Sequence, residues 1–393
     1  MSKQTTQTIL RLVGGILALL ILLVGAGITY IKVTRGSGLP YPDVSTEPLF
    51  GDDALEVVAE LPLPPANIAV SADERIFFNY HSLGSSGDEN GHTVFEWIDG
   101  AAVPYPSADF QENFQTTLGM LIDSQNRLWI IDPATLDNDR NTRLFAFDLE
   151  SDELIYDHTF QTDDADLAQD VQITADGRYV IAASTGLFDF VPANLIIHDT
   201  QTGETRTVLA GHESVGTQNW RITGPDGAGV TLLWGLIDWR IGVDGIALTD
   251  DDAWLYYGSI SHDTLYRVRT TDLLDASLTD DELAARIEAV GQKPMSDGFS
   301  MDQEGNVYIT DVENGGIARM SPDGVLTTLV KDDRVVWADG ISFGPDNMVY
   351  FTDSAIPLYL TDTFATIPPE EHAQVAPYYI FRFQNDIPGT PGS

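Results

Sequence analysis

The chain of 393 residues contains no cysteine. This absence excludes disulfide bonds, cysteine-ligated zinc, iron–sulfur centres and thiol nucleophiles. No Asn-X-Ser/Thr sequon occurs either, so N-glycosylation is not expected. Basic residues are scarce, with 20 Lys and Arg against 60 Asp and Glu. Such an acidic surface repels phosphate backbones, which argues against a nucleic-acid partner.

Acidic side chains are absent from the first 42 residues. This stretch includes 20 uncharged residues, LVGGILALLILLVGAGITYI, between Arg11 and Lys32. As a helix they span about 30 Å, which is the thickness of a bilayer core. We therefore predict a short tail at residues 1–11 and a single membrane-spanning anchor in the lipid bilayer at residues 12–31.

The alternative for this segment is a cleaved signal peptide, because Val24-Gly25-Ala26 offers a small-residue cleavage pattern. In both cases the layout of one hydrophobic segment before one large domain predicts a domain outside the cytoplasm. It is anchored in the first case and secreted in the second. Residues 32–53 are rich in Gly, Pro and Ser and lack periodicity, so they are predicted to be a linker that acts as a tether.

One unit recurs six times after this linker: a short apolar run, a turn rich in Asp, Gly or Asn, and a strongly β-forming run. Such a unit is typical of a β-hairpin. Six copies predict an all-β fold, a six-bladed β-propeller over residues 54–384, followed by a C-terminal tail at residues 385–393. The copies begin at Asn67, Leu118, Asp170, Asp244, Asp297 and Asp339.

Further β-forming runs supply the outer strands, but the sixth unit is one strand short. After its hairpin the only remaining run is YYIFRF from Tyr378, whereas ALEVVAEL from Ala54 precedes the first unit without a partner. Pairing these two runs would close the ring and remove its exposed sheet edges. Two insertions interrupt the pattern. Thr279 and Glu282 form a capping box that predicts a short helix, and the segment from Gly211, with three Trp, is predicted to cover one face of the ring.

Five of the six repeats begin with an oxygen-bearing side chain at one register. If these residues start the innermost strands, their side chains converge on the central cavity. The alternative is that Asp-Gly is simply favourable turn chemistry before a strand. We predict that Asp170 and Asp339 bind a ligand there, together with His81, which follows an inner hairpin and could reach the cavity as an acid or base.

Several stretches resemble the major royal jelly protein and Yellow family, in its bacterial branch. The resemblance is carried by MSDGFSMDQEGNVYITDVENGGIARMSPDG from Met295, by VWADGISFGPDNMVYFTDS from Val336 and by shorter runs between about Leu55 and Phe383. This family is similar in turn to the SMP-30 and gluconolactonase group of six-bladed propellers. Those enzymes bind one divalent metal through a Glu, an Asn and an Asp at the channel mouth.

The resemblance implies a metal site at the matching positions, Asn67, Asp244 and Asp297. Asn67 replaces the Glu and Asp244 replaces the Asn, so two of the three ligand types differ from those of the enzymes. A site of carboxylate and amide oxygens suits a divalent cation such as Ca²⁺ or Mg²⁺.

Three functions are compatible with these observations. The first is a metal-dependent hydrolase of a small lactone-like substrate, in which Asp297 or Asp244 orients or deprotonates the attacking water. The second is a non-catalytic propeller of the Yellow type that binds a small ligand. The third is a surface-displayed protein that binds partners through its blade faces. Family likeness alone does not choose among them, since propellers host many chemistries.

Overall fold

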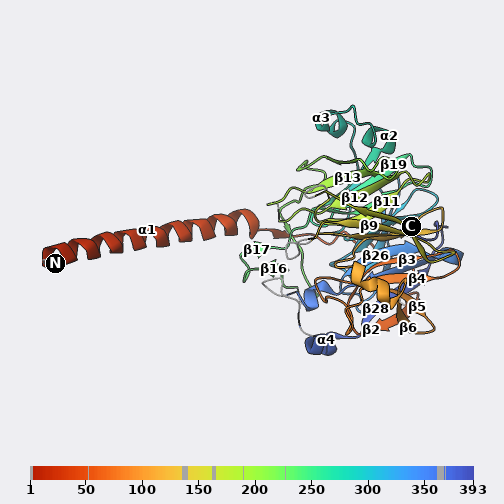
Figure 1. Ribbon diagram of the computed structural model, residues 1–393, viewed down its shortest axis with the longest axis horizontal. Helices are drawn as coiled ribbons and strands as arrows, with labels where there is room; N and C mark the ends of the chain where they lie inside the picture. The colour runs from red at the N-terminus through yellow and green to blue at the C-terminus, as the bar shows by residue number, and fades with distance from the viewer. Residues whose placement is uncertain are drawn as a thin grey trace.

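The computed structural model describes residues 3–393 except 52, 135–139, 162–164, 189, 226, 361–366 and 368. In these residues six four-stranded antiparallel sheets surround a central channel, which confirms the predicted six-bladed β-propeller (Figure 1). Each blade begins with its innermost strand, and each predicted hairpin forms the two inner strands of one blade.

The first three blades follow one another along the chain. Blade 1 contains β3 (Pro65–Val70), β4 (Ile76–Tyr80), β5 (Val94–Ile98) and β6 (Ala101–Pro104). Blade 2 contains β7 (Met120–Ile122), β8 (Arg127–Asp132), β9 (Arg143–Asp148) and β10 (Glu153–Thr159). Blade 3 contains β11 (Ala168–Ile173), β12 (Tyr179–Ser184), β13 (Asn194–Asp199) and β14 (Thr205–Val208).

The last three blades continue the order, and the sixth takes its outer strand from the start of the propeller. Blade 4 contains β18 (Val243–Leu248), β19 (Trp254–Ser259), β20 (Thr264–Arg269) and β21 (Glu288–Gln292). Blade 5 contains β22 (Phe299–Met301), β23 (Val307–Asp311), β24 (Gly316–Met320) and β25 (Leu326–Lys331). Blade 6 contains β26 (Ala338–Phe343), β27 (Met348–Asp353), β28 (Tyr378–Gln384) and β2 (Glu56–Leu61).

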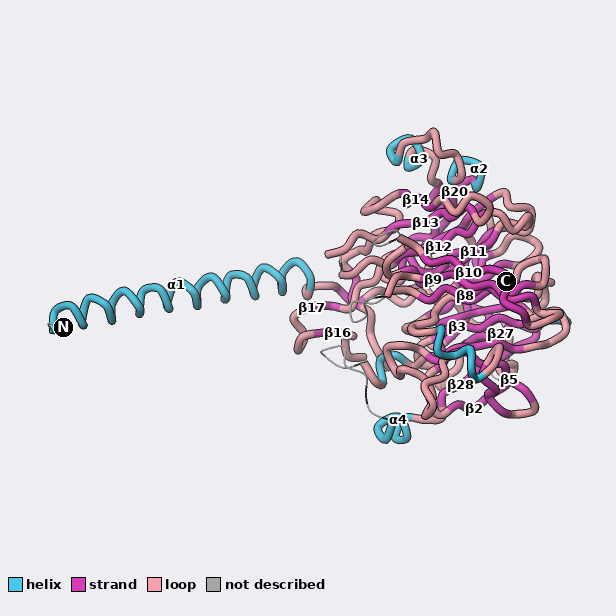
Figure 2. The backbone as a smooth tube through the Cα atoms, viewed as in Figure 1, coloured by secondary structure: helices cyan, strands magenta, loops and turns pink. Residues whose placement is uncertain are grey.

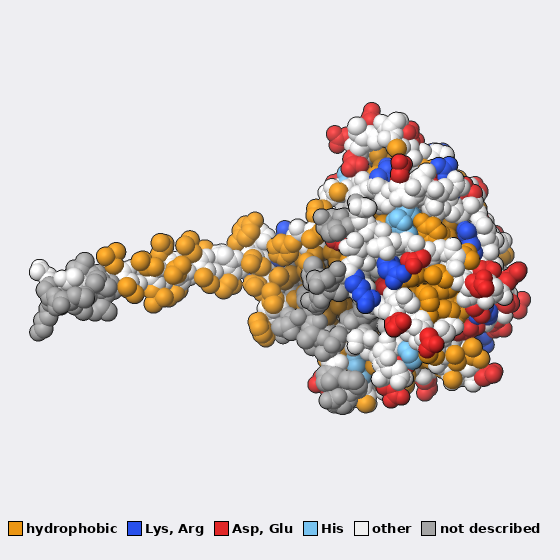
Figure 3. Space-filling view, viewed as in Figure 1, with side chains coloured by type: hydrophobic (Ala, Val, Ile, Leu, Met, Phe, Trp, Pro, Cys, Tyr) orange, Lys and Arg blue, Asp and Glu red, His pale blue; other side chains and the backbone are white. Residues whose placement is uncertain are grey.

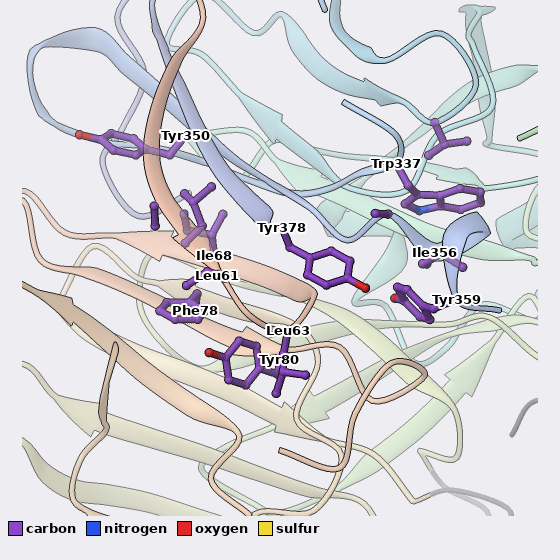
Figure 4. Close-up of a cluster of buried hydrophobic side chains, with 14 of the residues drawn as sticks. Leu61, Leu63, Ile68, Phe78, Tyr80, Trp337, Tyr350, Ile356, Tyr359 and Tyr378 are labelled. Atoms are coloured by element: carbon purple, nitrogen blue, oxygen red, sulfur yellow. The ribbon is translucent and has the colours of Figure 1, made fainter. Parts of the chain in front are cut away.

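The ring is closed by the non-local pair that the sequence predicted. Strand β2 runs antiparallel to β28, with Glu56 opposite Arg382 and Leu61 opposite Tyr378. The junction of blades 6 and 1 is filled by a large apolar cluster, in which Leu61, Ile68 and Phe78 lie close together (Figure 4). Burial of such side chains contributes roughly 25 cal/mol per Å² of apolar surface, so this junction holds the two ends of the ring together.

Short helices lie in the connections between strands. The predicted capping box is present at α3 (Asp280–Ala284), where Thr279 Oγ1 accepts from the Glu282 N–H and the Glu282 side chain accepts from the Thr279 N–H. The other helices are α2 (Thr270–Leu273), α4 (Pro369–Val375) and three 3₁₀ helices, Ala108–Asn113, Pro345–Asn347 and Ile356–Leu358.

The N-terminal helix α1 (Lys3–Arg35) extends away from the propeller (Figure 1). Its stretch Arg11–Arg35 is long and apolar enough to cross a membrane. The helix joins the propeller beside the insertion with three Trp, whose strands are β15 (Trp220–Arg221), β16 (Thr231–Leu232) and β17 (Ile237–Asp238) (Figure 2).

The segment after α1 differs from the expected tether. Strand β1 (Leu39–Pro40) pairs in parallel with β15, and the Tyr41 hydroxyl donates to the Lys293 carbonyl at 2.9 Å. Further along, the Leu49 and Phe50 N–H groups donate to carbonyls of β25. The composition resembles that of a flexible linker, but the polar backbone finds its partners in the propeller, so the segment lies along it.

The C-terminal segment after Asn385 covers the far end of the channel, where the inner strands finish. The Phe343 N–H donates to the Ser393 carbonyl at 2.8 Å, and the Ile122 N–H donates to the Gly392 carbonyl at 3.0 Å. A side chain could not be added at Gly389, since a Cβ there would lie 2.1 Å from the Phe343 ring. The predicted tail is therefore packed across the channel rather than exposed.

Removing residues 388–393 should destabilise the propeller. The segment accepts backbone bonds from Gln303, Ile122 and Phe343, and a side-chain bond from Ser300. At about 0.5–1.5 kcal/mol for each bond, the free energy of unfolding should fall by roughly 2 to 6 kcal/mol. Thr390→Ala, which removes only the bond to Asp250, should cost about 1 kcal/mol or less. Chemical denaturation measures both, and equal stabilities of truncated and full chains would contradict the packed segment.

Candidate functional site

Four of the polar residues at the repeat starts lie at irregularities of the innermost strands, and Asp297 lies just before strand β22. In β3, β11, β18 and β26 the register with the second strand shifts at the position of Asn67, Asp170, Asp244 and Asp339 respectively. A β-bulge re-aims a side chain and is common next to active sites. The bulge explains how consecutive residues of a buried strand can present a polar side chain to the channel.

Glycine follows the site residue where neighbouring inner strands approach most closely. A Cβ on Gly245 would lie 2.5 Å from the Asp297 carbonyl, one on Gly298 would lie 2.4 Å from the Asp339 carbonyl, and one on Gly340 would lie 2.6 Å from the Asn67 Cα. No side chain fits at such distances. The Asp-Gly pairs are thus explained by the close approach of adjacent blades, and not by turn chemistry.

This end of the channel forms one cavity of about 640 Å³. Its wall includes apolar side chains from the loops above the ring, among them Leu187, Phe188, Trp239 and Ile356. All six residues predicted from the sequence line it: Asn67, His81, Asp170, Asp244, Asp297 and Asp339. Leu118, at the same register in the second repeat, also lines the cavity but contributes no oxygen.

Asp244 and Asp297 are in direct contact, because their carboxyl groups share a hydrogen bond. Burial raises the pKa of both. The shared bond and the negative charge of Asp297 raise the pKa of Asp244 further, well above its usual value. Asp297 is instead held at a pKa of about 6, since it accepts from the Trp337 indole N–H at 2.6 Å and from Asp244. Asp244 is therefore the protonated partner and Asp297 the carboxylate.

The other two carboxyl groups are also difficult to ionise. Burial raises the pKa of Asp170 to about 7, against the opposing bonds from the Val171 and Ile246 N–H groups. Burial and the charges of Asp297 and Asp170 raise the pKa of Asp339 well above its usual value. The Oδ2 atom of Asp339 is buried and has no hydrogen-bond partner. The cavity thus contains more carboxyl groups than its own hydrogen-bond donors can stabilise in the ionised form.

His81 stands beside this cluster as a neutral side chain. Burial lowers its pKa to about 4, and its Nδ1 accepts from the Leu83 N–H at 3.1 Å. Its Nε2 lies 3.8 Å from Asp339 Oδ2, which is beyond a direct hydrogen bond. A water or a ligand hydroxyl between the two groups would satisfy both.

The donor set fits a hard divalent cation by its chemistry, since Ca²⁺ and Mg²⁺ bind carboxylate and amide oxygens. The buried, unpartnered Asp339 Oδ2 supports this fit. Among the described residues, however, no three His, Asp or Glu side chains already surround one point as metal ligands. The shared bond between Asp244 and Asp297 occupies the oxygens that a cation would need.

Three further residues shape the site and were not predicted from the sequence. The Trp337 indole N–H donates to Asp297, and the Trp337 backbone N–H donates to Asp353 at 2.7 Å. Burial raises the pKa of Asp353 to about 7. Lys293 is fully buried, donates to the Ser259 carbonyl at 2.8 Å, and has its pKa lowered to about 7 by burial. None lies at a repeat start. Asp353 does carry a periodic signal, because the second strands of blades 2, 5 and 6 all end in Asp. Trp337 lies two residues before Asp339, and Lys293 lies four residues before Asp297.

Comparisons with known proteins agree with the fold. Residues 236–334 match the family described as SMP-30/Gluconolactonase/LRE-like region. No curated protein matches the chain. Neither finding concerns the major royal jelly protein and Yellow family, so that resemblance stays a prediction.

Solved structures share the propeller over most of their length. A luciferin-regenerating enzyme has a TM-score of 0.54 at 12% identity, covering 86% of this chain and 97% of its own. A gluconolactonase from Xanthomonas campestris has a TM-score of 0.52 at 13% identity, with 90% and 98% covered. Regucalcin, a calcium-binding protein from Agrobacterium tumefaciens, has a TM-score of 0.50 at 12% identity, with 85% and 95% covered. The chain is an SMP-30/gluconolactonase-like six-bladed propeller in fold.

Asp297→Asn should stabilise the cation-free protein at neutral pH. The pKa of Asp297 is raised in the folded state, so the folded protein binds this proton more tightly than the unfolded chain does. The protonated Asp297 side chain therefore makes its full contribution to stability below about pH 4, and this contribution is lost as the pH rises through about 6. The gain of the variant over the native protein should be near zero at pH 4 and reach roughly 1 to 3 kcal/mol above pH 7.

Chemical denaturation with a chelator present, at several pH values, measures this difference. Comparing the two proteins at each pH cancels the contributions of other titrating groups. A difference that does not change with pH would contradict the raised pKa.

Proposed function

We propose that this protein is a membrane-anchored hydrolase of small lactone-like molecules, with its acidic site at one mouth of the channel. The observation that carries the proposal is the pair of buried carboxyl groups, Asp244 and Asp297, with different protonation at one cavity. A base needs a pKa close to the working pH, and Asp297, at about 6, meets this condition. The gluconolactonase among the similar structures supports the choice of substrate class.

In this proposal Asn67, Asp244 and Asp297 hold a divalent cation, with Asp170 and Asp339 nearby. When bound, the cation would polarise a carbonyl and lower the pKa of water. A cation would also replace the shared proton between Asp244 and Asp297, and so relieve the repulsion of the four carboxyl groups. The calcium-binding regucalcin among the similar structures is in keeping with Ca²⁺.

The residues of the chain supply positioning and proton transfer. Trp337 holds the Asp297 carboxylate in place. Asp297 takes a proton from the attacking water as the water oxygen bonds to the carbonyl carbon. The bond between this carbon and the ring oxygen then breaks, and Asp297 returns the proton to the ring oxygen. The product is the open-chain hydroxy acid, and apolar loops form part of the cavity wall around the reacting groups.

A non-catalytic ligand-binding propeller is the second candidate. The observation in its favour is the aromatic and apolar wall of the cavity, which includes Phe188, Trp239 and Trp337, together with the lack of a ready-made metal site among the described residues. Such a cavity suits a small molecule with a cationic or hydroxylated part directed at the carboxyl groups and an apolar part against the wall.

The test uses the full-length protein in nanodiscs. Calorimetry with Ca²⁺ and with Mg²⁺ should show binding, and a panel of lactones should release acid in a pH-stat. Asp297→Asn should lose cation binding and at least about 100-fold of the rate, as expected for loss of a general base. Asp250→Asn is the matched control, because Asp250 follows the far end of strand β18 and does not line the cavity.

The hydrolase proposal fails if the native protein binds neither cation and opens none of the lactones. Tight binding of a small molecule without turnover would then favour the second candidate. An equal loss of activity in both variants would point to general destabilisation, and the denaturation experiment described for Asp297→Asn separates that case.

Trp337→Phe tests the positioning of Asp297. Phenylalanine keeps the aromatic ring but removes the N–H that stabilises the Asp297 carboxylate. The pKa of Asp297 should therefore rise, and the acidic limb of the pH–rate profile should move to higher pH. A purely structural role would lower the rate at every pH and leave the limb in place.

A further inference from the structure

The membrane-spanning helix meets the propeller on the side that carries the cavity. Lys32 Nζ donates to the Gly235 carbonyl at 2.6 Å, and an Arg240 N–H donates to the Thr34 carbonyl at 2.9 Å. Gly235 and Arg240 belong to the insertion that supplies Trp239 to the cavity wall. In Figures 1 and 2, β16 and β17 of this insertion stand at the root of the helix, with the chain's C-terminus toward the opposite side.

Exposed apolar side chains surround this root. They belong to two loops on the cavity side, and we call them the apolar rim: Phe190, Val191, Leu233 and Trp234. Trp234 is 81% exposed and Phe190 is 59% exposed. Arg35 at the end of the helix lies over the Phe190 ring at 5.5 Å, and Trp234 directly precedes the residue that accepts from Lys32. Figure 3 shows hydrophobic side chains along the helix and continuing onto the propeller at its root.

The helix fixes the depth at which the rim lies. Lys32 and Arg35 end the uncharged span, and basic side chains at the end of a membrane helix lie at the level of the lipid headgroups. The exposed Tyr30 fits the same level, since Tyr and Trp concentrate there. The hairpin that carries Trp234 is bonded to Lys32, so it lies at headgroup depth as well.

The rim is continuous with the wall of the cavity. Phe188, Leu187 and Ile241 line the cavity and also belong to an apolar cluster with Ile31 of the helix and Leu236 of the hairpin. Apolar side chains are therefore continuous from the end of the helix to the wall of the cavity. Such a wall suits a ligand with an apolar part.

We propose that the lipid bilayer is the partner of this face: the apolar rim inserts at the headgroup level, and the cavity opens toward the membrane surface. The ligand then has an apolar portion and reaches the carboxyl groups from the lipid side. This inference rests on the proposed function only in that the helix is retained as an anchor, and it holds for a hydrolase and for a binding protein alike.

The absence of cysteine makes the test direct, because every introduced thiol is the only one in the chain. Full-length Leu20→Cys, Trp234→Cys and Val325→Cys proteins, each labelled with an environment-sensitive fluorophore, are reconstituted into vesicles. Nitroxide groups on the lipids, either near the headgroup or deep in the acyl chain, quench nearby labels. Val325 is the matched control, because it is also exposed and apolar but lies at the other end of the channel. Its hairpin contacts the turn at Gly305, and this turn is hydrogen-bonded to the C-terminal segment.

The label at position 234 should be quenched by headgroup nitroxides and shifted to shorter emission wavelengths, and the label at position 20 should be quenched by deep nitroxides. The label at position 325 should respond to neither. If position 234 behaves like position 325 while position 20 is quenched, the helix is an anchor but the docked face is wrong. If position 20 is not quenched either, the anchor itself is wrong.

Phe190→Cys provides an independent position on the rim and should behave like Trp234→Cys. Circular dichroism of each labelled protein checks that the β-propeller has formed. A rim label that stays unquenched in a folded protein at both positions would overturn the proposal.

Discussion

The close packing of the six innermost strands is the constraint on which the rest of the structure depends. Ring closure through β2 and β28 draws the blades together, and glycines at the site register let the neighbouring backbones approach. The same approach brings four aspartates into one poorly solvated cavity. Their charges repel, so the folded protein retains protons that the unfolded chain would release. The packing of the propeller thus offsets the unfavourable free energy of bringing these carboxyl groups together, as is common at functional sites.

The two ends of the channel are finished in different ways. The far end is covered by the C-terminal segment through backbone hydrogen bonds at the ends of the inner strands. The near end stays open as a cavity, framed by loops and by the insertion that carries Trp239. A channel covered at one end gives its ligands a single direction of approach along the axis. The apolar N-terminal helix joins the propeller on that same side, so the mouth of the cavity and the root of the helix lie together.

Electrostatics divides the four carboxyl groups into different roles. Trp337 and Asp244 stabilise Asp297 as a carboxylate, whereas burial and neighbouring negative charge raise the pKa of Asp244 and Asp339 well above the usual value. Asp353 helps to position Trp337, because it accepts a hydrogen bond from the Trp337 backbone N–H. A site of this kind can take a cation, move a proton or bind a hydroxylated ligand, and the balance among these depends on which charge enters the cavity.

The sequence by itself determined the parts of this protein that repeat or that act locally. The six hairpins, the capping box at Thr279 and the register of the five polar residues follow from local patterns that recur along the chain. The closing strand follows from counting the β-forming runs, because one run at each end of the propeller lacks a partner. Tertiary structure decided the rest: the docking of residues 36–50, the cover formed by the C-terminal segment, the bond from Trp337 to Asp297 and the meeting of the helix with the cavity side. These depend on contacts between residues 40 to more than 200 positions apart. Such contacts leave no period in the sequence, because their energy exists only once the ring has closed.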